Sequence, residues 1–388
     1  MKENITRRPL GKSGVLVSQV GLGCEHLQGM EAGAIRAVVD EALKQGMNIF
    51  DIFMSEPQVR TDIGSALAGR RDQVLLQGHI GAAWLNGQYC RTRKIDECEH
   101  FFEDFLVRLR TDYVDIGMLH YVDTPADFEA VFHSPVIEYA KRLKKEGVIR
   151  LLGMSSHDPG VARMAVETGL IDVLMFSINP SFDLAPAGTD LDGLFGGITE
   201  RREGVAGINA AREQLYRTCE RMGVGITVMK PLGAGRLLSA DTSPLGVSLT
   251  PAQCVHYALD RPAVSSVLVG CRTPEEVRAA AAYEKASAQE RDYTEALAGA
   301  WQFAAAKGQC MYCNHCLPCP KHIDVAQVGK FLDLAAAEPE VPATIRAHYE
   351  ALEHHASECI ACRSCERNCP FQVPVVERME KAAAIFGK

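Results

Sequence analysis

Two runs of cysteine near the C-terminal end constrain the fold of this chain more tightly than any other feature. Their members are Cys310, Cys313, Cys316, Cys319, Cys359, Cys362, Cys365 and Cys369. Pro320 follows the first run and Pro370 follows the second. Four thiols within ten or eleven residues can surround one compact centre, and the proline then turns the chain away from it.

The second run has the spacing C-x2-C-x2-C-x3-C-P of bacterial two-cluster ferredoxins, and the first differs only in a shorter last gap. The spacing therefore predicts two [4Fe-4S] clusters in which the last cysteine of each run binds the other cube. One cube would be held by Cys310, Cys313, Cys316 and Cys369, and the other by Cys359, Cys362, Cys365 and Cys319. Structural zinc is the alternative, although zinc sites usually use two separated CxxC pairs.

Before the cysteines, short apolar runs alternate with amphipathic stretches over about 280 residues. The predicted strands are residues 20–23, 48–52, 74–80, 114–120, 151–155, 173–178, 225–230 and 266–269. The predicted helices between them are residues 32–45, 97–110, 136–145, 160–168, 210–222, 251–259 and 274–283. Eight such units predict a (β/α)8 TIM barrel. A doubly wound sheet competes, but no GxGxxG follows the first strand.

From about residue 286 the pattern becomes helical, at residues 288–306, 325–337, 342–356 and 375–385. The sequence thus predicts two domains, a barrel over residues 1–285 and an all-α, ferredoxin-like iron–sulfur domain over residues 286–388. We expect this second domain to dock on or beside the catalytic face of the barrel.

The charge and the apolar pattern limit the partners. A net charge of −8 without a basic block argues against nucleic acid as a partner. No stretch approaches the length of an apolar membrane span, and the N-terminus has no signal-like apolar core. Free cysteines and predicted clusters indicate a reducing, cytoplasmic setting. The oligomeric state is not predicted.

In a TIM barrel the chemistry lies where strands end, at the C-terminal face. This rule selects Cys24, Asp51, His79, His120, Ser155, Ser156, Asn179, Lys230 and Gly270. The long, Gly- and Asp-rich connection at residues 180–207 follows the sixth strand, and we interpret it as a substrate lid.

Several stretches in order along the chain resemble the aldo-keto reductase family, and with the cysteine runs they resemble its subgroup with a C-terminal iron–sulfur extension. They are LGKSGVLVSQVGLG, NIFDIF, TDYVDIGMLH, GVIRLLGMSSH, VMKPLGAGRL and VLVGCRTPEEV. Members of the family usually carry an Asp, Tyr, Lys and His tetrad, in which the tyrosine protonates a carbonyl oxygen.

The resemblance implies a catalytic site at Asp51, Glu56, His79 and His120. Asp51 and His120 fall on the aspartate and the histidine of the tetrad. Glu56 stands where the tyrosine is usual, and His79 stands where the lysine is usual. Glu56 could act as an acid if burial raised its pKa, and the histidines could transfer protons near neutral pH. A decayed site of ordinary polar residues is the alternative.

The resemblance also implies a phosphate cradle after the seventh strand and at the helix after the eighth. Its residues are Pro231, Leu232, Gly233, Gly235, Gly270, Arg272 and Glu275, and Ser155, Ser156 and Asn179 would contact the cofactor ring. Glu276 stands where an arginine often binds the 2′-phosphate, and Ala279 and Ala280 replace an adenine-binding pair. NADPH binding in the usual pose therefore looks weakened, and FMN could use the same cradle.

These patterns predict an oxidoreductase in which two [4Fe-4S] clusters exchange electrons with a site at the barrel mouth, through FMN or NAD(P)H. The electron donor would be a ferredoxin or a similar partner. A small molecule with a carbonyl or an activated alkene would be reduced, or the reverse oxidation would run. Two alternatives remain: a conventional NAD(P)H-dependent carbonyl reductase with structural clusters, and a non-catalytic electron-transfer subunit.

Overall fold

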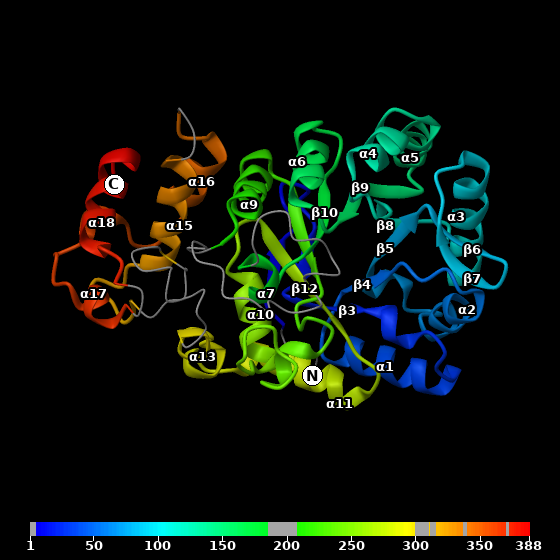
Figure 1. Ribbon diagram of the computed structural model, residues 1–388, viewed down its shortest axis with the longest axis horizontal. Helices are drawn as coiled ribbons and strands as arrows, with labels where there is room; N and C mark the ends of the chain where they lie inside the picture. Colours follow the sequence, from blue (N-terminus) through cyan, green and yellow to red (C-terminus); the bar gives the residue numbers. More distant parts are fainter. Residues whose placement is uncertain (1–4, 185–207, 299–309, 311–315, 337–339, 370–371) are drawn as a thin grey trace.

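The computed structural model describes residues 5–184, 208–298, 310, 316–336, 340–369 and 372–388. Its centre is a closed barrel of eight parallel strands in the order β10-β11-β12-β3-β4-β5-β8-β9 (Figure 1). The strands are β3 (Val20–Gly23), β4 (Ile49–Ile52), β5 (Leu75–Ile80), β8 (Val114–Leu119), β9 (Ile149–Ser156), β10 (Val173–Ser177), β11 (Gly225–Met229) and β12 (Val264–Gly270). The predicted TIM barrel is confirmed.

Helices surround this barrel. They are α1 (Ala32–Lys44), α2 (Pro57–Ala66), α3 (Ile95–Leu109), α4 (Pro125–Phe132), α5 (Pro135–Glu146), α6 (Pro159–Glu167), α7 (Pro180–Asp183), α9 (Ala210–Met222), α10 (Pro251–Leu259) and α11 (Pro274–Ala281), with short turns η1 (Cys24–Leu27), η2 (Arg71–Gln73), η3 (Arg236–Leu238) and η4 (Ala282–Lys285). Seven of the helices begin with proline directly after a residue whose side chain accepts a bond from the first turn, such as Thr124 or Ser134. Such a cap satisfies a free backbone N–H, and proline lacks one.

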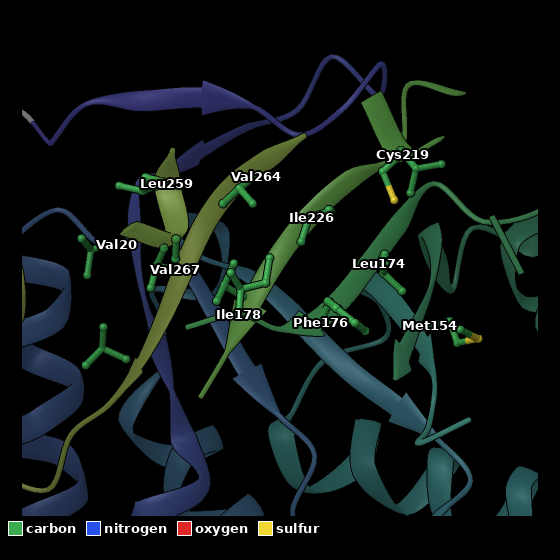
Figure 2. Packing of buried hydrophobic residues seen from close by; sticks show 14 of the residues in the cluster. Val20, Met154, Leu174, Phe176, Ile178, Cys219, Ile226, Leu259, Val264 and Val267 are labelled. Carbon is green, nitrogen blue, oxygen red and sulfur yellow. The ribbon is translucent and has the colours of Figure 1, made fainter. Parts of the chain in front are cut away.

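Apolar packing lies on both faces of the strands. Outward side chains such as Leu174, Phe176 and Ile226 are fully buried and belong to the same core as Cys219 of α9 and Leu259 of α10 (Figure 2). A second cluster is formed by Ile49, Ile116, Met118, Val173, Met175 and Leu268. Strands buried on both faces explain the continuous apolar runs in the sequence.

In the described part of the chain, two hairpins lie outside the barrel sheet. The first, β1 (Arg7–Pro9) with β2 (Leu16–Ser18), contacts the segments that lead into β11 and β12, where Arg8 Nη1 donates to Leu259 O at 2.9 Å. The second, β6 (Ala82–Leu85) with β7 (Gln88–Arg91), follows β5 directly. Its turn, Asn86-Gly87, has positive φ angles of 52° and 76°, as a type I′ turn requires.

The C-terminal segment (residues 286–388) contains the helices α12 (Ala288–Arg291), α13 (Thr294–Ala298), α15 (Val325–Ala336), α16 (Ala343–Glu350), α17 (Ser364–Asn368) and α18 (Val375–Phe386), with a turn η5 (Ala356–Glu358). Helices are present in the described part of this segment, while the all-α ferredoxin-like domain and its boundary at residue 286 stay predictions. None of the helices in the described ranges is long and apolar enough to cross a membrane.

This segment docks away from the expected place. His348 of α16 lies 3.1 Å from Glu220, near the end of α9 that leads into β11. Lys330 of α15 interacts electrostatically with Glu220 and with Asp260, and Asp260 is the residue that follows α10. Both carboxylates precede strands, so they lie at the end of the barrel opposite the mouth. Figure 1 shows α15–α18 at one end of the long axis and the β6–β7 hairpin at the other. The prediction that the segment docks on or beside the catalytic face is therefore wrong for the contacts described.

Glu220 should be important for this docking. Its carboxylate also accepts a bond from Ala263 N at 2.8 Å, and burial lowers the pKa of nearby Lys330 to about 8. Glu220→Gln removes the charge that stabilises Lys330, so we expect a loss of about 1–3 kcal/mol in the free energy of unfolding. Denaturant unfolding checks this, with Glu213→Gln on the same helix as the control. Equal midpoints for both variants would contradict the prediction.

Candidate active site at the barrel mouth

One continuous chain of hydrogen bonds lies at the carboxyl ends of β4, β5 and β8. Asp51 Oδ1 is 2.9 Å from His79 Nε2, and His79 Nδ1 is 2.8 Å from His120 Nδ1. His120 Nε2 is in turn 2.6 Å from the phenol oxygen of Tyr89. Gln77 Nε2 donates to the same oxygen of Asp51 at 2.9 Å. Three of the four predicted catalytic residues thus meet at the barrel mouth, where His79 is hydrogen-bonded to both Asp51 and His120.

The chain runs from the buried interior to solvent. Asp51, His79 and His120 are only 3%, 2% and 4% exposed, whereas Tyr89 is 41% exposed. The half-buried ring of Phe53 stacks on His120, with the ring centroids 5.7 Å apart. The phenol is therefore the member of the chain that a substrate at the surface can reach.

The β6–β7 hairpin delivers Tyr89 to this position. Tyr89 pairs with Trp84 across the two strands, and aromatic pairs of this kind stabilise hairpins. On one side, Ser55 Oγ donates to Ala83 O at 2.5 Å. On the other, Arg91 Nη1 of β7 donates to the backbone oxygen of Tyr121, the residue after His120, at 2.9 Å. The hairpin is thus tied to the loops that follow β4 and β8.

Burial determines the protonation states of His120 and Tyr89, the two members of the chain nearest the surface. It lowers the pKa of His120 well below 6.5, and His79, Arg93 and Arg91 lower it further. Burial also raises the pKa of Tyr89 to about 12, against the opposite influence of Arg91. At neutral pH the His120 ring is therefore neutral and the Tyr89 phenol keeps its proton.

Glu56, which we expected among the catalytic groups, lies at the start of α2. Its carboxylate accepts a hydrogen bond from Val59 N at 3.3 Å, so it caps this helix. A catalytic role for Glu56 stays a prediction, and the capping bond alone accounts for its position.

The predicted ring-binding residues have structural partners. Ser155 Oγ accepts from Tyr121 N at 2.8 Å, and Ser156 Oγ donates to Asp123 at 3.0 Å. Asn179 caps α7 and donates to Lys230 O at 2.9 Å. All lie at the carboxyl ends of their strands as predicted, and their contacts with a cofactor stay predictions.

The glycine-rich loop after β11 forms a chain of tight turns. Gly233 and Gly235 have φ angles of 58° and 84° and donate to Lys230 O and Leu232 O. Pro231 and Leu232 lie within the same turns. Since these glycine N–H groups are already bonded inside the loop, a phosphate would have to use other donors or displace these bonds.

The segment after β12 carries a carboxylate at the predicted cradle. Glu276 accepts a hydrogen bond from Arg272 N at 2.6 Å. Glu275 pairs instead with Arg278 on the exposed side of α11. A Cβ atom placed on Gly270 would lie 2.4 Å from the His26 ring, so glycine allows this ring to approach the end of β12.

Cysteines from both runs line one pocket in the C-terminal segment, namely Cys319, Cys359, Cys362 and Cys365. Apolar side chains complete it, including Ile323, Val376 and Met379. Cys310, Cys316 and Cys369 are partly buried. Cys313 lies outside the described residues, as do residues 185–207 of the lid that was predicted at residues 180–207. Within the described ranges no three His, Cys, Asp or Glu side chains gather around a single ion.

Sequence reasoning missed Tyr89, because it sought a tyrosine five residues after Asp51. A signal was present. Asn86-Gly87 lies between two short runs and is a strong indication of a hairpin. The hairpin begins at Ala82, shortly after His79 near the end of β5, and its second strand carries Tyr89 to the mouth.

The barrel and the hydrogen-bonded groups at its mouth have the layout of a TIM-barrel enzyme site. A family model described as the Aldo/keto reductase family matches residues 19–248. The chain therefore belongs to the aldo/keto reductase family and is an oxidoreductase of that type.

Two curated relatives and one solved structure illustrate this similarity. The uncharacterized oxidoreductase YqkF of Bacillus subtilis is 28% identical and covers 70% of this chain and 89% of its own. The NADH-specific methylglyoxal reductase of Escherichia coli is 23% identical over 60% of this chain and 69% of its own. The holo form of the Bacillus halodurans aldo-keto reductase AKR11C1 has a TM-score of 0.59 and 24% identity, over 78% of this chain and 99% of its own.

Proposed function

We propose that this protein is an NADH-dependent carbonyl reductase. The observation that carries the proposal is the buried chain from Asp51 through His79 to His120, which ends at the mouth of an aldo/keto reductase barrel. Such a chain can hold and deliver a proton where a carbonyl oxygen gains charge.

The residues of the mouth would have different roles in the proposed reaction. A bound dihydronicotinamide would supply the hydride for the carbonyl carbon. The histidine chain supplies the proton for the oxygen, and the packed ring of Phe53 excludes water from His120. The buried carboxylate of Asp51 orients His79 through its 2.9 Å bond.

The preference for NADH over NADPH is supported by Glu276. This carboxylate stands where the family often has an arginine for the 2′-phosphate, and it would repel that group. A carboxylate can instead accept a bond from a ribose 2′-hydroxyl. The E. coli relative is named as NADH-specific, which agrees with this proposal.

The charge at residue 276 gives a direct test of the preference. For Glu276→Arg, we expect the ratio of kcat/KM for NADPH to that for NADH to rise about 10- to 100-fold, since about 1.4 kcal/mol corresponds to tenfold. Steady-state kinetics with both nucleotides measure it. Glu146→Arg makes the same charge change on α5 and serves as the control. An unchanged ratio for Glu276→Arg would mean that the ribose 2′-position of the bound nucleotide does not lie beside residue 276.

We also propose that the C-terminal segment binds two [4Fe-4S] clusters. The thiol pocket supports this, because it joins Cys319 of the first run to three cysteines of the second, as the crossover pattern requires. In a cube each thiolate binds a separate iron, so the sulfurs surround a space instead of one ion. Ala361 N donates to Cys359 Sγ at 3.5 Å, a bond of the kind that tunes cluster potentials. A reducing cytoplasm would preserve these thiols.

Electron relay through these clusters is the second candidate function, and the thiol pocket is the observation that favours it. A ferredoxin or a similar donor would be the partner. The segment docks near Glu220, remote from the β6–β7 hairpin. This position favours clusters that do not exchange electrons with the mouth. We therefore place the relay second.

Anaerobic turnover separates the two functions. With NADH and a series of simple aldehydes, the reductase should form one alcohol per NADH oxidised, without any added electron donor. Reduction only by protein whose clusters had been reduced with dithionite would favour the relay. A flavin spectrum in the released cofactor would favour FMN over NADH.

A further inference from the structure

The partners at the mouth determine which atom is the donor in each hydrogen bond of the chain. Ionised Asp51 can only accept, so His79 Nε2 carries the proton between them. In a neutral ring His79 Nδ1 must then accept, and His120 Nδ1 donates to it. His120 Nε2 is left as an acceptor, so the Tyr89 phenol donates to it at 2.6 Å. In this resting arrangement the phenol oxygen can accept a proton from an alcohol.

We propose that Tyr89 is the catalytic residue that exchanges the proton with the substrate oxygen, in place of the tyrosine that the family carries five residues after the aspartate. This inference rests on the proposed carbonyl reductase function. The hairpin therefore brings a phenol back to the mouth from a different element, while Glu56 caps α2.

Reduction requires one proton more than the resting arrangement. When His120 is protonated, its Nε2–H donates to the phenol oxygen, and the phenol O–H is free to point at the substrate carbonyl. In that arrangement the substrate oxygen would take the phenol proton as the carbonyl carbon gained the hydride that a bound dihydronicotinamide would supply. Tyr89 then takes the Nε2 proton of His120, and the chain returns to its resting state. Alcohol oxidation is the reverse.

The charges around His120 decide the pH dependence. The groups that face it are His79, Tyr89, Arg91, Arg93 and His157, with Asp51 behind His79. Burial lowers the pKa of His120, and the neighbouring histidines and arginines lower it further. Reduction should therefore slow as pH rises, and oxidation should not show the same fall.

Tyr89→Phe tests the assignment, because it removes the hydroxyl and keeps the aromatic pair with Trp84. We expect kcat for NADH-dependent aldehyde reduction to fall about 10²- to 10³-fold. The dissociation constant for NADH, measured by fluorescence titration, should stay within about twofold, because no cofactor contact is removed. The fall of the rate with rising pH should be lost from the residual activity. Tyr113→Phe, at the other end of β8, should match the wild type in all three measurements.

The outcomes separate this inference from the function on which it rests. A wild type that reduces aldehydes, with Tyr89→Phe equally active or with the same pH profile, would overturn the role of Tyr89 alone. Loss of NADH binding in Tyr89→Phe would make the role structural and would also overturn it. A wild type that never oxidises NADH with a carbonyl would remove both proposals.

Discussion

Asp51→Asn should lower kcat for aldehyde reduction about 10²- to 10⁴-fold while leaving the fold intact. The carboxylate accepts bonds from both Gln77 and His79, and these bonds fix the tautomer of His79. An amide oxygen can still accept one of them, but its NH2 group can donate to His79 and reverse the order of protons. Steady-state kinetics at saturating NADH measure the loss.

Asp115 offers a matched control on β8, which is separated from β4 by β5 in the barrel. It is also buried, and it bonds to Leu76 N, Arg71 and Arg150 at the opposite end of the barrel. Asp115→Asn should lower the midpoint of thermal unfolding and leave kcat close to that of the wild type. If both variants lost stability and activity in parallel, Asp51 would be a structural residue and not the anchor of a proton chain.

Double cysteine variants should reveal which thiols share a cluster. Wild-type protein prepared anaerobically should hold about eight irons in two cubes. Since Cys319 and Cys365 line one pocket, Cys319→Ala combined with Cys365→Ala should remove only one cube and leave about four irons. Cys310→Ala combined with Cys365→Ala should remove both. Iron and sulfide counting gives the result.

The same double variants test the simpler arrangement in which each run binds its own cube. In that case Cys319→Ala with Cys365→Ala would lose nearly all the iron. Cys98→Ala, in the buried core of the barrel, should retain the full iron content. Zinc in place of iron and sulfide would contradict the cluster proposal itself.

The barrel was predictable because its buried strands appear in the sequence as short apolar runs that alternate with amphipathic helices. Residues 20–23 form a strand with the predicted bounds, and the strand predicted at residues 266–269 extends to Val264–Gly270. The bounds shift because apolar runs report burial, whereas strand ends depend on pairing with neighbours. Asp51, His79 and His120 could be placed together because parallel strands bring their carboxyl ends to one face.

Contacts between distant elements could not be predicted in the same way. Nothing in the spacing of the cysteines says that His348 meets Glu220, so the docking side of the C-terminal segment was predicted wrongly. Tyr89 was missed because it reaches His120 from a hairpin outside the eight units. Glu56 shows the same limit, since a carboxylate before Pro57 fits a helix cap as well as an acid.

Transfer of deuterium from NADH that carries two deuterium atoms at C4 is the most direct measurement of the proposed reaction. Anaerobically prepared wild-type protein, given this NADH and an aldehyde with no other electron donor, should place one deuterium on the carbinol carbon of each alcohol. An alcohol that carries only solvent hydrogen, or that forms only when a one-electron donor is added, would contradict the account.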